Sequence, residues 1–125
     1  MIVDTDVLIW YARGNREAIK IIHNLNQLFI SVITYMEIIQ GVRNRKELNI
    51  FKKTLGILDI KVLQIDDLIS TKAMFFVEQY YLSHSMELAD ALIGATAVLK
   101  KRSLITGNDK HYRHLPGITI KKFKK

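Results

Sequence analysis

The stretch that decides the fold is MIVDTDVLIW, residues 1–10, in which an apolar run is interrupted by Asp4 and Asp6. Its first three residues are predicted to form a short buried strand, and the apolar residues after them are typical of a helix. A carboxylate at the end of a buried strand is costly to remove from water unless a cation or several hydrogen-bond donors compensate it. This segment therefore predicts a strand followed by a helix. It also indicates that the acidic side chains at their junction have a role that offsets the cost of burying them.

The rest of the chain alternates between helix-like and strand-like segments. Helical periodicity predicts six helices, over residues 6–15, 16–25, 34–42, 46–58, 66–83 and 86–102. Short apolar runs predict four further strands, over residues 28–33, 61–65, 103–106 and 118–123. Strands that alternate with helices favour a parallel sheet covered on both faces. We therefore expect one α/β domain over residues 1–125, with about five strands.

Three helix starts carry capping signals. Asp66 predicts an N-cap for the long helix that follows it, and Ser85 predicts one for the last helix. Thr34 and Glu37 have the spacing of a capping box, which by itself accounts for the glutamate.

Charge and composition restrict the classes of function. Lys and Arg number 19 against 12 Asp and Glu, and the excess of +7 gathers at residues 43–46, 100–102 and 121–125. A basic surface favours a polyanionic partner such as nucleic acid, although solvated clusters of this kind also occur simply for solubility. Cysteine is absent, which excludes disulfides and thiolate metal sites and suits a reducing cytoplasm. The longest apolar helical run, residues 91–99, is far shorter than the ~20 residues of a membrane helix, so we expect a cytoplasmic protein without a membrane segment.

Several polar residues follow predicted strands. In a parallel sheet, the carboxyl ends of the strands form the edge where ligands bind. Asp4 ends the first strand, Glu37 lies early in the helix after the second, and Asn108 and Asp109 follow the fourth. In the same loop, Tyr112 is expected to anchor the chain in the core, whereas His111 and His114 are expected to be solvated.

Asp90 is an acid in an otherwise apolar helix. An ionised carboxylate there requires a partner, which could be a cation or a buried Lys or Arg. Gly94 and Ala97 share its helix face, and small residues would let this face approach the sheet closely. We expect Asp90 to lie against the strand ends.

Each acid also has a simple structural explanation, since Asp4 and Asp6 could be N-caps and Asp109 a turn residue. The conjunction of four acid-bearing segments at one edge favours a site instead. Clustered carboxylates repel one another unless a cation lies among them, and oxygen ligands without Cys or paired His select Mg²⁺ or Mn²⁺. An acidic pocket within a basic surface is typical of a metal-dependent nuclease.

Four stretches carry a resemblance to a known family. They are MIVDTDVLIW (1–10), SVITYMEIIQG (31–41), LADALIGATA (88–97) and LITGNDKHYRHLPGI (104–118). In order and spacing they resemble the PIN-domain family, especially its VapC-type ribonuclease toxins. The resemblance implies a three-layer α/β/α sandwich and an Mg²⁺- or Mn²⁺-dependent endoribonuclease that cuts RNA. It also implies a small antitoxin protein as partner, and a homodimer.

The resemblance assigns roles to individual residues. Asp4 and Asp90 would be the main metal ligands, and Glu37 would be the third acid around the metal ion. Asp6 would be a supporting ligand or an N-cap. The fourth acidic position falls on Asn108, with the neighbouring Asp109 as the other candidate.

Two rival functions remain open. DTDV, residues 4–7, also fits the first motif of haloacid-dehalogenase phosphatases, with Asp4 as nucleophile and Asp6 as acid and base. No later Ser/Thr and Lys motifs support that function, and the chain is short for that fold. The other rival is a non-catalytic relative that binds RNA or protein, against which the intact acids argue.

Overall fold

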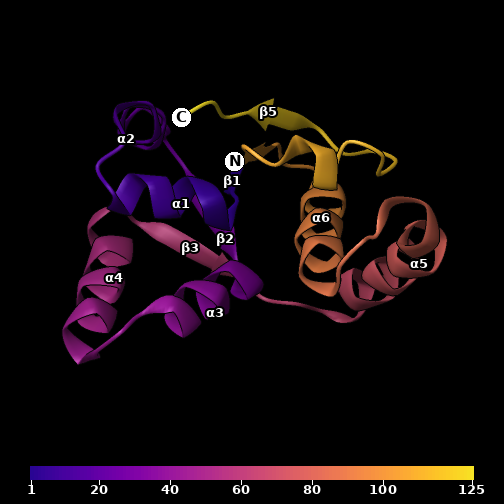
Figure 1. Ribbon diagram of the computed structural model, residues 1–125, viewed down its shortest axis with the longest axis horizontal. Helices are drawn as coiled ribbons and strands as arrows, with labels where there is room; N and C mark the ends of the chain where they lie inside the picture. Colours follow the sequence, from indigo (N-terminus) through magenta and orange to yellow (C-terminus); the bar gives the residue numbers. More distant parts are fainter.

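The first strand lies at the centre of the sheet. The computed structural model describes residues 1–125 and contains five strands (Figure 1). They are β1 (Ile2–Val3), β2 (Leu28–Ser31), β3 (Ile60–Leu63), β4 (Leu104–Thr106) and β5 (Ile120–Lys122). The helices are α1 (Thr5–Ala12), α2 (Arg16–His23), α3 (Val32–Gly41), α4 (Arg45–Ile57), α5 (Asp67–His84) and α6 (Leu88–Lys100), with a short 3₁₀ helix, η1 (Asp109–His111). Every predicted helix and strand is present, and no end differs from its prediction by more than three residues.

All strands are parallel, in the order β3-β2-β1-β4-β5. The chain therefore places β1 and β4, which are a hundred residues apart, side by side, with Val3 paired to Ile105. Polar groups that follow these two strands must lie next to one another at the carboxyl edge of the sheet.

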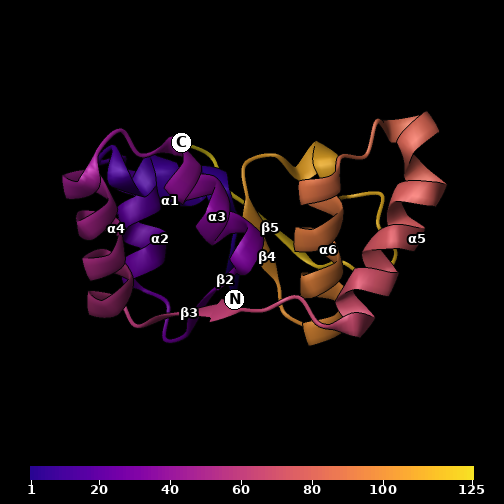
Figure 2. The same cartoon turned by 90° about the horizontal axis from the view of Figure 1, so that it is seen from below.

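Helices cover both faces of this sheet, which confirms the predicted three-layer α/β/α sandwich (Figures 1 and 2). Successive residues of a strand point to opposite faces of the sheet, so they pack in different hydrophobic cores. Ile2 and Leu104 pack with α5 and α6, whereas Val3 and Ile105 pack with α1, α2 and α4. Helix α3 contacts both α1 and α6 at the carboxyl edge of the sheet. None of the helices combines the length and apolar character needed to cross a membrane.

The capping predictions had different outcomes. Asp66 caps α5 as predicted, because its Oδ1 accepts a hydrogen bond from the backbone of Ile69 at 2.8 Å. The capping box at Thr34 is wrong, since Ser31 is the N-cap of α3 and Thr34 lies inside the helix. The N-cap at Ser85 is also wrong, because Ser85 ends α5 in the left-handed region with φ of 53°.

Helix α6 is held tightly by the loop that follows β4. Its small residues are almost fully buried, with Ala91 and Ala95 at 0% exposure. A Cβ on Gly94 would lie 2.5 Å from Leu115 Cδ1 and 3.5 Å from Tyr112 Cδ1. The absence of a side chain at Gly94 therefore lets the 107–117 loop, rather than the sheet alone, approach the face of α6 that carries Asp90.

Candidate active site

Asp4 lies at the carboxyl end of the central strand, where it is only 4% exposed. Its Oδ1 accepts a hydrogen bond from the backbone N–H of Thr5 at 2.8 Å, so Asp4 is the N-cap of α1. Its Oδ2 accepts one from the hydroxyl of Thr106 at 2.7 Å. Burial outweighs these donors and raises the pKa of Asp4 to about 6. The residue therefore caps a helix and also keeps a strongly perturbed carboxyl group at the site.

Asp90 faces Asp4 from the first turn of α6. Its Oδ2 lies 3.1 Å from Nδ1 of His111, and its Oδ1 accepts a hydrogen bond from the hydroxyl of Tyr112 at 3.1 Å. Burial raises the pKa of Asp90. Its partners are thus an imidazole and a phenol from the loop after β4, rather than a buried Lys or Arg.

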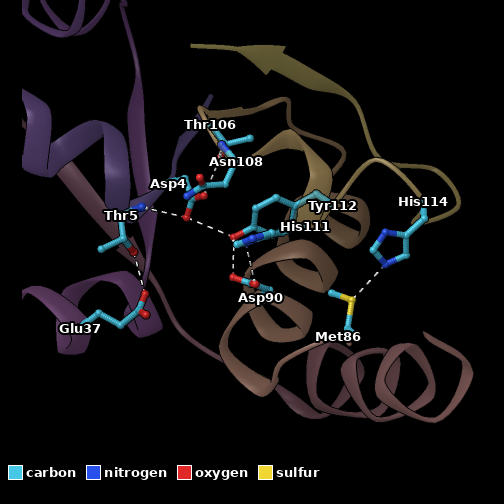
Figure 3. A network of polar contacts seen from close by, with 10 residues as sticks. All are labelled: Asp4, Thr5, Glu37, Met86, Asp90, Thr106, Asn108, His111, Tyr112 and His114. Carbon is cyan, nitrogen blue, oxygen red and sulfur yellow. Dashed lines mark hydrogen bonds and ion pairs between the residues drawn. The ribbon is translucent and has the colours of Figure 1, made fainter. Parts of the chain in front are cut away.

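Tyr112 connects the two carboxylates (Figure 3). Its side chain is 1% exposed, which confirms that it anchors the loop in the core. Its hydroxyl lies 3.2 Å from Asp4 Oδ1 and 3.1 Å from Asp90 Oδ1, between the two acids. Burial, followed by the charges of Asp4 and Asp90, raises the pKa of Tyr112 far above its usual range, so the phenol keeps its proton.

Asp6 supports the site from the first turn of α1. Its Oδ2 accepts a hydrogen bond from the backbone N–H of Gly107 at 2.8 Å, which holds the loop after β4 against α1. Its Oδ1 is buried and has no hydrogen-bond partner, and burial raises the pKa of Asp6. Asp6 is therefore not an N-cap, since Asp4 has that role.

Glu37 is connected to the residue after Asp4 through the hydroxyl group of Thr5. The hydroxyl of Thr5 donates to Glu37 Oε1 at 2.7 Å (Figure 3). The same hydroxyl lies 3.0 Å from the hydroxyl of Thr34. Thr5 is also the residue whose N–H Asp4 caps. Glu37 is solvent-exposed in α3, so it borders the site instead of forming its floor.

The two candidates for the fourth acidic position lie differently. Asn108 is solvent-exposed and lies beside Asp4 and Thr106 (Figure 3), and its backbone N–H donates to Thr106 Oγ1 at 3.0 Å. The carboxylate of Asp109 points to cations, with Arg113 Nη1 at 3.9 Å and Lys122 Nζ at 3.7 Å. Of the two, Asn108 is the side chain next to the acids.

The structure contains no group of three or more His, Cys, Asp or Glu side chains arranged to hold a metal ion directly. Mg²⁺, however, usually binds proteins through only one or two carboxylates and keeps several water ligands. Asp4 and Asp90 form such a pair, and the unpartnered buried oxygen of Asp6 is a further hard acceptor next to it. The residues present therefore suit a partly hydrated divalent ion, with Glu37 near enough to act through water.

Sequence reasoning missed the role of Tyr112 as a bridge, and it treated His111 as solvated. The side chain of His111 is solvent-exposed, but its Nδ1 contacts Oδ2 of Asp90. The other loop histidine also differs from its expectation, because His114 stacks on His84 at 4.2 Å and lies 3.2 Å from Met86 Sδ, away from the acids. The position of Tyr112 four residues after Asn108 was the available signal, but spacing alone cannot place a hydroxyl.

The three basic clusters lie in different places. Lys122 is in register with Thr106, so the cluster at 121–125 borders the site. Lys100 ends α6 and lies roughly 15 Å along the helix axis from Asp90, at the opposite end of the strands. Arg43 pairs with Glu47 at 2.9 Å. The C-terminal cluster therefore lies beside the loop after β4, whereas Arg43 lines a groove that also contains Glu37.

This fold, with acids at the carboxyl ends of adjacent parallel strands, agrees with a family comparison that matches the PIN domain over residues 1–117. The chain belongs to the PIN-domain family. Divalent metal ions are the general cofactors of PIN nucleases. The match with the PIN domain also argues against the haloacid-dehalogenase alternative. In that alternative Asp6 would act as acid and base, whereas here its Oδ2 accepts a hydrogen bond from the backbone N–H of Gly107.

Individual relatives point to one branch of the family. The chain is 30% identical over 128 residues to Ribonuclease VapC1 of Methanocaldococcus jannaschii, covering 100% of this chain and 88% of that protein. It is similar to the structure of a toxin–antitoxin complex from Klebsiella pneumoniae, with 31% identity, 94% coverage of both chains and a TM-score of 0.75. The fold also matches DNA-bound VapBC from Salmonella typhimurium, with 23% identity, coverage of 97% and 96%, and a TM-score of 0.79.

Proposed function

We propose that this protein is a cytoplasmic endoribonuclease that hydrolyses RNA phosphodiester bonds with the help of Mg²⁺ or Mn²⁺. The observation that carries the proposal is the pair of carboxylates, buried Asp4 and partly buried Asp90, that share the hydroxyl of Tyr112 at the carboxyl edge of the sheet. The similarity to Ribonuclease VapC1 over the whole chain supports RNA as the substrate.

Asp4 and Asp90 would hold the ion, and Glu37 would be the third acid, placed to act on a water molecule at the open side of the site. A bound divalent ion supplies positive charge to the scissile phosphate and lowers the pKa of a water molecule. Glu37 would orient the attacking water and accept its proton, because its carboxylate is exposed and its Oε1 is held by the hydroxyl of Thr5. As the water oxygen bonds to phosphorus, the bond from phosphorus to the leaving ribose oxygen would break, and that oxygen would take a proton from solvent. Asn108 positions the phosphate, and Lys122 binds a neighbouring phosphate of the RNA backbone.

Replacement of Asp4 by Asn tests this function. Asp4→Asn should abolish RNA cleavage in the presence of Mn²⁺, because the ion loses the ligand on the central strand. Cleavage of a labelled RNA measures the loss, and circular dichroism verifies the fold. Cleavage at the wild-type rate by this variant would show that Asp4 is not a ligand. A wild-type protein that cleaves no RNA with either ion would favour the non-catalytic alternative.

We also propose an antitoxin partner, because an active ribonuclease in its own cytoplasm requires restraint. A groove of about 790 Å³ lies between α1, α3 and α4, and its lining includes Arg13, Arg43 and Glu37. A segment with apolar residues and a carboxylate suits this groove, where it would reach Glu37 at the border of the site. The similarity to a toxin–antitoxin complex supports this partner. Co-purification with the product of a neighbouring small gene tests it.

The exposed face of α5 favours a homodimer. Leu68, Phe75 and Leu82 are spaced seven residues apart along this helix and are 71%, 53% and 93% exposed. An apolar stripe of this kind is typical of a helix that packs against another protein surface. Sedimentation of the purified chain tests the assembly, because a species of 14.5 kDa at all concentrations contradicts it.

A further inference from the structure

The Tyr112 hydroxyl is the one group that contacts both Asp4 and Asp90 in the hydrogen-bond network of the site. We propose that Tyr112 is a positioning residue, whose hydroxyl holds the two carboxylates in the orientation needed to share one divalent ion. The inference rests on the proposed function in one respect, namely that these two acids are the ligands.

The two acids come from distant parts of the chain, and no other single group contacts both of them. Asp4 is fixed by its hydrogen bonds to Thr5 and Thr106, on the β1 side of the site. Asp90 lies on α6, and its only other polar partner is the exposed His111. The phenolic oxygen lies within 3.2 Å of an oxygen of each acid, and therefore determines how far apart they stand.

Without this hydroxyl, two partly buried carboxylates would face each other with no donor between them. Like charges at this range repel, and each carboxylate would turn toward water or toward another donor. A shared ion would require both carboxylates to turn an oxygen toward the same point, so small rotations of either carboxylate would disturb its binding. Groups that orient metal ligands in this way typically change metal affinity by about 10- to 100-fold when removed.

The aromatic ring of Tyr112 has a separate role, which allows the hydroxyl to be tested alone. The ring is 1% exposed, belongs to the core cluster with Ala91 and Leu115, and packs against α6 at Gly94. Phenylalanine keeps all of these ring contacts and removes only the oxygen between the acids. Tyr112→Phe should therefore remain folded.

The experiment is a titration of the full-length chain with Mn²⁺ alone, in which the free ion is measured by electron paramagnetic resonance. We expect Tyr112→Phe to weaken Mn²⁺ affinity by about 10-fold or more. Tyr11→Phe is the matched control, because it also removes a hydrogen-bonded hydroxyl, 2.8 Å from His23 Nε2, but leaves the acids untouched. Its Mn²⁺ affinity should equal that of the wild type.

A second measurement distinguishes a loss of metal-ligand positioning from a general loss of activity. RNA cleavage by Tyr112→Phe should recover toward the wild-type rate at saturating Mn²⁺, with the half-activating concentration raised by the same factor as the dissociation constant. Unchanged or tighter Mn²⁺ binding by Tyr112→Phe overturns the inference, as does a loss of rate that Mn²⁺ cannot restore.

Asp90→Asn distinguishes the two proposals: if it binds Mn²⁺ as the wild type does, the ligand assignment fails, and the inference fails with it. If only Tyr112→Phe behaves as wild type, the ligand assignment stands and the inference alone fails.

Discussion

Asp4 has two functions that conflict energetically. As the N-cap of α1 it stabilises a helix start, typically by about 1 kcal/mol. As a buried acid beside Asp6 and Asp90 it is difficult to ionise, as its raised pKa shows. Residues that are unfavourable for stability and are nevertheless placed in a buried site are typical of functional centres.

This conflict predicts a pH-dependent gain in stability for Asp4→Asn. The pKa of Asp4 in the folded protein, about 6, lies above its ordinary value of 3.8, so ionisation disfavours the folded state. This contribution is absent below about pH 4, grows as the pH rises to about 6, and is constant above that. Without metal at pH 7, Asp4→Asn should therefore be more stable than the wild type by about 1–3 kcal/mol.

Urea unfolding in the presence of a chelator, at several pH values between 4 and 7, measures this gain. Asp59→Asn is a suitable control, because the side chain of Asp59 is 85% exposed and its replacement should leave the stability almost unchanged at each pH. A stability difference between Asp4→Asn and the wild type that does not vary with pH would contradict the prediction.

Among the single elements, helix α6 packs closely against the loop that follows β4, which leaves no room for a side chain at Gly94. The loop containing Tyr112 and Leu115 packs directly on Gly94, on the helix face that presents Asp90 to Asp4. The sequence predicted that small residues on this face allow a close approach. It attributed the approach to the sheet, because the path of a loop is decided by tertiary packing rather than by local periodicity.

Gly94→Ala should destabilise the protein by about 1–2 kcal/mol, because overpacking outweighs the gain in helix propensity. The new Cβ would lie 2.5 Å from Leu115 Cδ1, and Leu115 is only 3% exposed. Gly56→Ala in α4 is the matched control. Its Cβ would meet nothing within 4 Å, so that variant should gain up to about 1 kcal/mol. Chemical denaturation of both variants measures the contrast, and changes of the same sign would contradict it.

Helix ends illustrate how far the sequence alone can predict elements. Asp66 was a reliable signal because an N-cap depends on residues within one turn. Ser85 was misleading because the turn between α5 and α6 requires a left-handed residue there, which the sequence alone does not reveal. The start of α6 at Leu88 instead has Glu87 as its N-cap, without a side-chain hydrogen bond.

For the whole molecule, the parallel topology was predictable from alternation, and so was the gathering of polar groups at one edge. The geometry within the site was not, because it depends on loop packing over the carboxyl ends of β1 and β4. Asn108 and Asp109 are adjacent in sequence, yet one lies beside Asp4 and the other faces Arg113 and Lys122. The direction of each side chain in a turn follows from the fold around it.

The uneven charge predicts that position matters more than net charge for RNA binding. Lys122→Ala should weaken binding of single-stranded RNA and lower the slope of log K against log salt by about 0.7, as expected for one lost phosphate contact. Lys100→Ala removes the same charge, from a lysine that also has one long ion pair, at 4.0 Å to Asp66. That variant should bind as the wild type does.

Fluorescence anisotropy at several salt concentrations measures both lysine variants, with Asp4→Asn as the common background to prevent cleavage. Equal losses of affinity would mean that the RNA is attracted by the overall charge and that Lys122 has no special contact.

The position of β1 between β2 and β4 also has a consequence for the order in which the site is assembled. Asp4 emerges first during synthesis, but the hydroxyl groups that contact it belong to Thr106 and Tyr112, 102 and 108 residues later. Because chains fold in part as they are made, the earlier helices and strands can form while β4 is still missing. Until Thr106 and Tyr112 have been added, Asp4 therefore lacks both hydroxyl partners, and the proposed nuclease site is incomplete in the nascent chain.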